Sequence, residues 1–165
     1  MNWYVLYVLS NKSNKILSNL NQRKELVAFI PKCEVFHREE KIKTVKVMFN
    51  NYIFVKSELK QDEFNDLLLL MKDRNDGLIK QLKNAEVSAM TKGEIEFFNN
   101  ILDKDYVARV STGYKENGKT IITSGPLLHY QDHIVKVIKP NCTAHLDLSF
   151  FDRKIILGIE LKSKD

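Results

Sequence analysis

The sequence lacks any long hydrophobic run. Its apolar runs, such as residues 67–71, are far shorter than the roughly 20 residues that a membrane-spanning helix requires. The first residues also lack a basic segment leading into an apolar core, which is the pattern of a secretion signal. We therefore expect a cytoplasmic protein with no membrane partner.

Cysteine is scarce, with only Cys33 and Cys142 in the chain. Because the two are far apart in the sequence, we expect neither a disulfide framework nor a cysteine-based metal site. His129 and His133 are four residues apart, but they fall in a loop-to-strand segment where this spacing does not place both on one face. The sequence therefore predicts no metal site and no cofactor.

Motifs of catalysis are missing as well. The chain has no Gly-rich phosphate loop, no nucleophile elbow and no zinc-type cluster. Its acidic residues fall mainly on predicted helices with lysines nearby, which is typical of solvated surfaces rather than of paired catalytic carboxylates. We expect a protein that is not an enzyme. A hydrolase without a visible motif is kept as a distant third hypothesis, behind the two binding functions given below.

Positive charge is in modest excess and unevenly distributed. The chain has 26 basic and 21 acidic residues, which gives a formal net charge of +5. Residues 1–50 hold nine basic and four acidic residues, residues 51–118 ten and twelve, and residues 119–165 seven and five. The basic first third favours a polyanionic partner. A protein without such a partner can also have a solvated basic face, so this alternative stays open.

Residues 45–56 form the stretch around which we expect the chain to be organised. Two short runs of β-branched and aromatic residues flank Asn50-Asn51, a pair that tolerates positive φ, so we expect two strands joined by a tight bend. In the second strand, Tyr52 and Phe54 face one way while residues 53 and 55 face the other. Both faces are therefore covered, either by the protein itself or, on one side, by a partner.

Strand and helix patterns alternate through residues 1–103. Apolar residues at intervals of three and four mark the helices, and Thr91 with Glu94 has the spacing of a capping box. Pro31 restricts its strand to an edge or an irregular start. The expected elements are strands at 3–8, 27–37, 42–47, 52–56 and 78–82, and helices at about 12–26, 62–74 and 92–103. This βαβββαβα order predicts an α+β sandwich with helices on a mostly antiparallel sheet.

The rest of the chain is expected to form a linker and a second domain. Residues 104–118 mix charge with Gly and Ser and hold few large apolar groups, which predicts a flexible linker. Residues 119–165 contain four or five short strands between turn signals, the pattern of a small β-barrel. Phe150 continues an inward-facing alternation in this region, whereas Phe151 breaks it, so Phe151 either caps the barrel core or contacts a partner.

The first predicted helix has a basic and amide-rich outer stripe. Lysine and arginine at this spacing would hold phosphates, while asparagine and glutamine can read base edges. A polar outer face is also the rule for any surface helix, so a solvated face is the open alternative. The predicted nucleic-acid-binding set is Lys12, Lys15, Asn19, Gln22 and Arg23, with Arg74 added to it.

Three blocks of the chain resemble NusG-type transcription elongation factors. Residues 49–55 (Phe-Asn-Asn-Tyr-Ile-Phe-Val) resemble that family's Phe-Pro-Gly-Tyr-x-hydrophobic-Val block, and residues 3–8 resemble its opening strand. Residues 122–127, 134–138 and 150–153 resemble its carboxy-terminal KOW module. The resemblance implies an NGN-like domain over residues 1–103, a linker over 104–118 and a KOW-like, SH3-like barrel over 119–165.

The resemblance also implies partners and binding residues. The NGN-like domain would bind the clamp helices of the largest RNA polymerase subunit through Tyr7, Phe49, Tyr52 and Phe54, and would suppress pausing and termination. Non-template DNA or nascent RNA would be a second partner. Phe151 matches a partner-contacting aromatic of the KOW module, which recruits a ribosomal protein or a termination factor. A monomer is expected.

Departures from the family pattern suggest a specialised member. Asn50 stands where the family commonly has Pro, and His129 and Asp132 stand where the KOW signature often has Gly. Within the family the chain looks most like the operon-specific antiterminators of the LoaP and RfaH type. The second hypothesis is an RNA- or ribosome-binding KOW protein that acts through residues 119–165.

Overall fold

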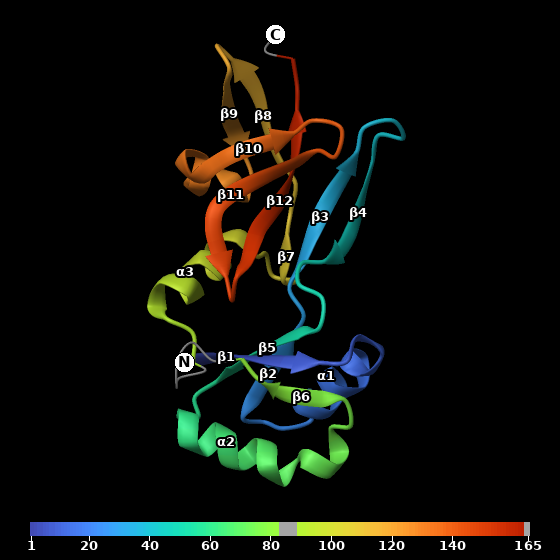
Figure 1. The fold of residues 1–165 in the computed structure, drawn as a ribbon, viewed down its shortest axis with the longest axis vertical. Helices are drawn as coiled ribbons and strands as arrows, with labels where there is room; N and C mark the ends of the chain where they lie inside the picture. The colour runs from blue at the N-terminus through green and yellow to red at the C-terminus, as the bar shows by residue number, and fades with distance from the viewer. Residues whose placement is uncertain (83–88, 164–165) are drawn as a thin grey trace. The chain divides into compact units, whose positions relative to one another are not determined.

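The computed structural model describes residues 1–82 and 89–163, which form two compact units. The first unit comprises Met1–Pro31 and Phe49–Ile95, and the second comprises Lys32–Met48 and Glu96–Asp165. The first unit combines a sheet with helices, and the second contains a curled β-sheet (Figure 1). The mixed α+β class, with an NGN-like region followed by a KOW-like one, is as expected. Within the described ranges, no helix is both long and apolar enough to cross a membrane.

The first unit is built on a four-stranded antiparallel sheet in the order β2-β5-β1-β6 (Figure 1). Its strands are β1 (Asn2–Val8), β2 (Leu26–Phe29), β5 (Tyr52–Ser57) and β6 (Leu78–Gln81). Its helices are α1 (Ser13–Asn21) and α2 (Gln61–Leu70), with short 3-10 turns at Ser10–Lys12 and Lys72–Arg74. α3 (Lys92–Ile101) begins in this unit and ends in the second.

One face of this sheet forms a hydrophobic core with α1 and α2. Ile16 and Leu20 of α1 and Phe64 of α2 are at most 1% exposed and belong to one cluster with alternate residues of β1 and β5. Tyr4 of β1 stacks on Phe64 with 4.1 Å between ring centroids. The i, i+4 spacing of the α1 residues places both on the face that packs on the sheet.

Local signals in the sequence account for several element boundaries. Asn51 adopts a φ of 71°, and β5 begins directly after it, so the bend expected at Asn50-Asn51 is confirmed. The capping box before α3 is also confirmed: the Thr91 amide donates to a Glu94 carboxylate oxygen at 2.9 Å, and the Glu94 amide donates to the Thr91 hydroxyl at 3.2 Å.

Several boundaries differ from those expected, among them the end of α2 at Leu70 rather than near residue 74, and two of the differences have a clear local cause. α1 ends at Asn21 rather than near residue 26, because the Asn21 side chain accepts from the Ala28 amide at 2.7 Å and donates to the Ala28 carbonyl at 2.9 Å. An amide side chain that bonds to a neighbouring strand in this way fixes the turn after the helix. The strand expected over residues 27–37 is two strands in separate sheets, since Ile30-Pro31 interrupts the ladder and Pro31 has no amide to donate.

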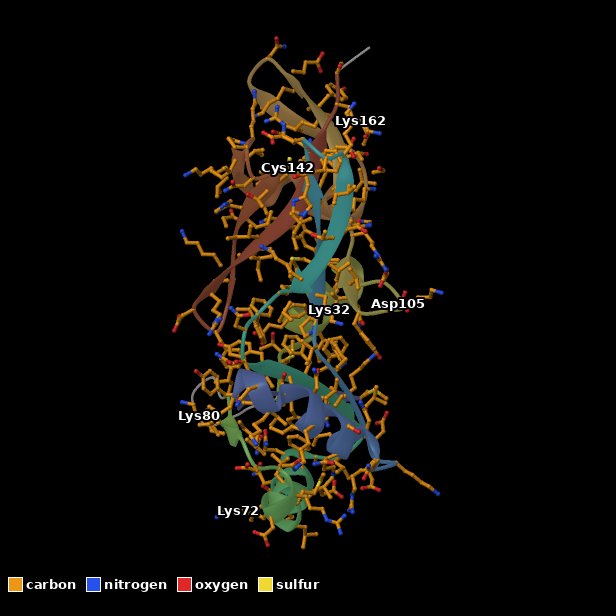
Figure 2. All side chains as sticks on the ribbon, turned by 90° about the vertical axis from the view of Figure 1, so that its right-hand side faces the viewer. Lys32, Lys72, Lys80, Asp105, Cys142 and Lys162 are labelled. Carbon is orange, nitrogen blue, oxygen red and sulfur yellow. The ribbon has the colours of Figure 1, made fainter. Side chains whose placement is uncertain are left out.

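The second unit contains a five-stranded sheet in the order β10-β11-β12-β8-β9 and a three-stranded sheet in the order β4-β3-β7. The three-stranded sheet consists of β3 (Lys32–His37, its first residue labelled in Figure 2), β4 (Ile42–Val47) and β7 (Val107–Ala108). The other strands are β8 (Ser111–Glu116), β9 (Lys119–Ser124), β10 (Ile134–Ile138), β11 (Thr143–Phe150) and β12 (Arg153–Leu161), with a 3-10 segment at Pro126–His133.

The two sheets of this unit approach each other closely at Gly158. A Cβ atom at this position would lie 2.3 Å from the Glu34 carbonyl oxygen, so β3 packs directly against the backbone of β12. The buried side chains of the five-stranded sheet include Leu146, Phe150 and Leu157, each at most 3% exposed. Phe150 is buried, as the alternation of apolar residues along β11 predicts.

Residues 104–118, which we expected to form a flexible linker, contain β7 and β8 in the structure. Their small residues are required by close packing. A Cβ atom at Gly113 would lie 2.3 Å from the Ile121 carbonyl oxygen, and Ser111 is fully buried against Gly125, where an added Cβ would lie 2.6 Å from the Ser111 Cα. Glycine and serine here allow backbones to approach rather than giving the chain freedom.

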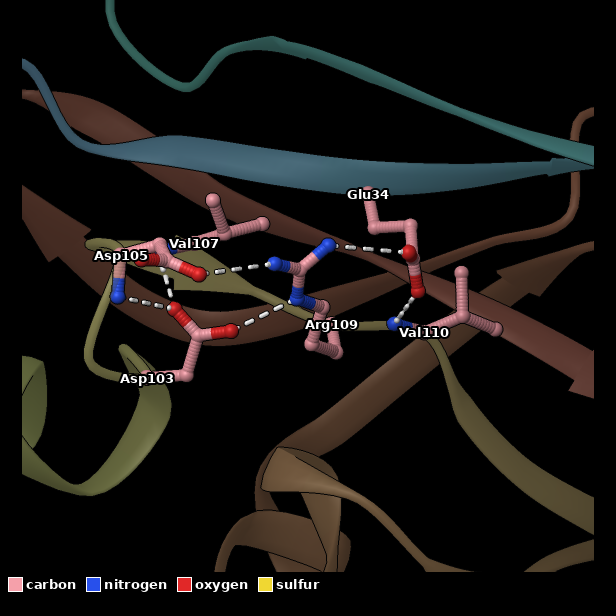
Figure 3. Close-up of polar contacts among 6 residues, drawn as sticks. All are labelled: Glu34, Asp103, Asp105, Val107, Arg109 and Val110. Atoms are coloured by element: carbon pink, nitrogen blue, oxygen red, sulfur yellow. Dashed lines mark hydrogen bonds and ion pairs between the residues drawn. The ribbon is translucent and has the colours of Figure 1, made fainter.

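A charged network fixes the start of this segment to β3 (Figure 3). Arg109 donates through Nε to Asp103 at 2.6 Å and through Nη1 to Glu34 at 3.2 Å, and its Nη2 lies 3.7 Å from Asp105. The other Glu34 oxygen accepts from the Val110 amide at 3.0 Å. Desolvation acts to raise the pKa of Asp103, but hydrogen bonds from Arg109 and from two backbone amides outweigh it, and the pKa is lowered.

Candidate functional site

The second face of the first unit's sheet is made of aromatic rings. Side chains alternate along a strand, so β1 and β5, which are paired with Val5 opposite Phe54, contribute every second residue to this face. Phe49, directly before the β5 turn, joins the same set. We call this set the aromatic face; its rings are Trp3, Tyr7, Phe29, Phe49, Tyr52 and Phe54.

The rings of the aromatic face are in mutual contact. Phe54 lies at the centre, with its centroid 5.5 Å from that of Phe29 and 6.2 Å from that of Phe49. Phe49 also lies 5.7 Å from Tyr52, which is 6.2 Å from Tyr7. Centroid distances in this range are typical of stabilising aromatic pairs, both for tilted or edge-on rings and for near-parallel ones such as Phe49 and Phe54.

All four residues expected to bind polymerase therefore lie on one face, but their exposure differs. Phe54 is fully buried, and Phe49 and Tyr52 are 3% and 5% exposed, whereas Tyr7 is half-buried. Truncation of the first three rings will therefore affect stability, and any measurement of their role in binding has to separate the two effects.

The sequence reasoning missed two rings of the aromatic face, Trp3 and Phe29, and the neighbouring Lys56. The Lys56 ammonium lies 5.3 Å from the Trp3 ring centroid and 5.4 Å from that of Phe29, within the range of a cation–π contact. The period-two alternation of residues 3, 5 and 7 was the available signal for Trp3. Phe29 could not be placed without the pairing of β2 with β5.

The structure brings together four of the six predicted nucleic-acid-binding residues. A hollow of about 440 Å³ beside α1 is lined by Asn19, Gln22, Arg23 and Arg74, together with Leu70 and Met71. Lys12 and Lys15 lie outside this lining.

Several of these polar groups already have partners within the first unit. The Asn19 amide donates to the Arg74 carbonyl at 2.7 Å, Lys12 pairs with Asp76 at 3.5 Å, and Arg23 pairs with Glu25 at 3.5 Å. The ion pairs are exposed and hence weak, so both cations can exchange a carboxylate for a phosphate at little cost. Asn19 is different, because its hydrogen bond joins α1 to the turn after α2.

Phe151 occupies the two-residue turn between β11 and β12. Phe151 and Asp152 have φ values of 48° and 64°, as a tight hairpin with both central residues in the left-handed region requires. The Phe151 ring is half-buried and lies 4.7 Å, edge to face, from Phe150, which contacts Phe98 at 5.1 Å. Phe150 thus belongs to the core, and Phe151 lies at its margin.

The model of one protein family, described as transcription termination factor nusG, matches residues 1–99. The chain belongs to the NusG family. The matched residues contain all of the described aromatic face and all of α1. The comparison with curated proteins found no match.

Membership of the NusG family supports a general role in transcription elongation or antitermination. Proteins of this family are transcription regulators, not enzymes, and typically bind RNA polymerase.

Proposed function

We propose that this protein is a processive antitermination factor that binds RNA polymerase through the aromatic face. One observation carries the proposal. Six aromatic rings lie together on one face of the sheet, and all six fall within the residues matched by the family. Tryptophan and tyrosine, together with arginine, are the side chains most enriched at energetically important positions of protein interfaces.

Tyr7, Phe49, Tyr52 and Phe54 are the proposed contacts with the clamp helices of the largest polymerase subunit. A factor bound there would favour the closed clamp and so make pausing and termination rarer. It need only bind the closed state more tightly than the open one, because a ligand shifts an equilibrium by its differential affinity alone.

Two further contacts complete the proposal. The α1 stripe and Arg74 would hold non-template DNA or nascent RNA, with phosphates on Lys12, Lys15 and Arg23. Phe151 would contact a recruited protein, such as a ribosomal protein or a termination factor. The substitution of Asn50 for the family's usual Pro supports action on a particular operon rather than on all transcription.

Transcription by purified RNA polymerase with the full chain tests this function. We expect the chain to co-purify with polymerase, to shorten pauses and to increase read-through of a terminator. Operon specificity is tested by comparing two templates. One carries the leader of the operon that neighbours the gene encoding this chain, and the other lacks it. Unchanged pausing and read-through at a saturating concentration of the chain would contradict the proposal.

The alternative is an RNA- or ribosome-binding KOW protein that acts through residues 119–165. It predicts co-sedimentation of the full chain with ribosomes in the absence of polymerase and no effect on read-through in the purified system.

A further inference from the structure

The second unit contains a strongly basic groove. It has a volume of about 880 Å³ and lies between the β3–β4 hairpin and residues of β8, β10 and β12. Six basic side chains and one carboxylate, that of Glu160, line it. We call it the basic groove; its cations are Arg38, Lys41, Lys43, Lys115, Lys139 and Lys162. Lys162 is labelled in Figure 2, as is Cys142, which also lines the groove.

These cations come from distant parts of the sequence. The hairpin supplies Lys43, which lies opposite Phe36 in the β3–β4 register, so the two side chains project from the same face of the hairpin. Lys115 comes from β8, and Lys139 follows β10. Neither the charge count of residues 1–50 nor that of residues 119–165 reveals this cluster, because the fold assembles it.

Among the residues that the structure describes, most of this charge is not neutralised. Lys162 lies 3.9 Å from Glu160, and Arg38 donates to the Lys139 carbonyl at 3.4 Å. Within residues 1–82 and 89–163, no ion pair engages Lys41, Lys43 or Lys115. Clustered, unneutralised cations in a hollow create a positive potential that attracts polyanions.

The basic surface continues beyond the groove. A neighbouring hollow of about 360 Å³ shares Lys115 and Val137 with it and adds Lys119 and Lys136, with Asp132 as its carboxylate. The two hollows thus form a track of eight cations along one unit. A track of this length matches an extended polyanion better than a single phosphate group.

Apart from Glu160 and Ser163, the lining between the cations is apolar. Phe36, Val137, Ile159 and Leu161 contribute it, and Phe36 is the aromatic ring among them. Phe36 is half-buried, so part of the side chain remains accessible. A charged channel with an aromatic surface for stacking is the arrangement by which proteins hold unpaired bases and their phosphates. A duplex, whose bases are stacked inside, would not use the apolar lining.

We propose that the basic groove binds a single strand of nucleic acid, with its lysines on the phosphates and Phe36 against a base. This site is separate from the α1 stripe in the first unit and does not rest on polymerase binding. RNA and single-stranded DNA present the same backbone chemistry to it, so the experiment includes both.

Fluorescence anisotropy of the full chain with labelled oligonucleotides tests the site. The oligonucleotides have about 12 nucleotides, a length within the range that single-strand-binding modules cover. The groove variant replaces Lys41, Lys115 and Lys139 with Gln. A matched control variant replaces three exposed lysines that do not line the groove, Lys92, Lys104 and Lys154, with Gln. Both variants lose the same net charge.

We expect the groove variant to lower the salt dependence of single-strand binding by roughly 2 logarithmic units per decade of salt, since each lost phosphate contact removes about 0.7. If the groove variant and the wild type bind equally at 1 M salt, this change in slope makes the variant bind about a hundredfold more weakly at 0.1 M salt. The control variant should change both quantities little. Equal losses in the two variants would show diffuse charge attraction and overturn the site.

The base contact has its own measurement. A 2-aminopurine-containing strand should show quenched fluorescence when bound, and Phe36→Leu, which keeps an apolar side chain in the hairpin, should reduce that quenching. Binding of duplex DNA as tightly as of either single strand would contradict the proposed occupant. The RNA and single-stranded DNA arms identify which strand is preferred.

Lysine acetylation of the wild-type chain provides a readout that does not depend on how variants fold. Bound oligonucleotide should protect Lys41, Lys115 and Lys139 from acetylation while leaving Lys92 and Lys104 reactive, as measured by mass spectrometry. Uniform protection, or none, would overturn the proposal. A failure of the chain to bind polymerase would leave this result unaffected, so the two proposals fail separately.

Discussion

Phe54 and Phe64 offer a matched pair for separating binding from stability. Both are fully buried, and they lie on opposite faces of the first unit's sheet: Phe54 contacts Phe29 and Phe49, and Phe64 stacks on Tyr4. Truncation of a buried Phe to Ala typically costs about 3–5 kcal/mol of unfolding free energy. We expect both Phe54→Ala and Phe64→Ala to show a loss of this size.

Urea unfolding followed by Trp3 fluorescence measures these losses, because Trp3 is the only tryptophan of the chain and lies on the aromatic face. Polymerase affinity is then measured under conditions where each variant is mostly folded, with Phe54→Leu as a milder replacement. We expect the folded Phe54 variant to bind about 2 kcal/mol more weakly, or about 30-fold, and the folded Phe64 variant to bind normally.

Two outcomes would refute this reasoning. If both variants lose stability and neither loses affinity once folded, the aromatic face is core and the polymerase contact lies elsewhere. If Phe54→Ala costs less than about 1 kcal/mol of unfolding free energy, the packing described around this ring does not contribute as a buried aromatic normally does.

Three further changes give distinct expectations. Replacing Lys12 and Lys15 with Ala should lower the salt slope of DNA or RNA binding by roughly one to two units, and an unchanged slope would remove α1 from the interface. Phe150→Ala should lower the unfolding free energy by about 3–5 kcal/mol, whereas Phe151→Ala should abolish recruitment of a second protein while thermal unfolding stays nearly unchanged; equal destabilisation would place Phe151 in the core. The lowered pKa of Asp103 stabilises the folded chain above the ordinary pKa of 3.8, and this stabilisation is lost as the pH falls through the folded-state pKa. The melting temperature of Asp103→Asn should therefore lie below that of the wild type at pH 7 and converge with it in acid, and a constant gap would exclude the carboxylate as the cause.

Local signals in the sequence were sufficient for elements that short-range interactions define. The capping box at Thr91 and the bend at Asn51 depend on residues within three positions, so the sequence pattern alone places them. The end of α1 depends on a bond from Asn21 to Ala28, and such a side-chain contact has no periodic signature.

Long-range packing explains what the sequence did not reveal. Ser111 and Gly113 looked like linker residues because small side chains are common in flexible segments, yet here they lie where backbones approach within van der Waals distance. The aromatic face was only partly predicted for a similar reason. Phe29 joins it through pairing of β2 with β5, and the basic groove requires a hairpin to meet strands more than 70 residues later.

The pairing of β3 with β7 and its packing on β12 affect how the second unit can fold during synthesis. Lys32 pairs with Val107, and Gly158 lies against Glu34, so the early β3–β4 hairpin can pair with β7 once residue 108 has been made but can pack on β12 only when that strand has been made. Structures that depend on contacts between residues far apart in the sequence fold slowly. Until residue 161 has been synthesised, β3 lacks the β12 backbone on which it packs, and a fragment that begins at residue 119 would leave one edge of β12 without its β8 partner.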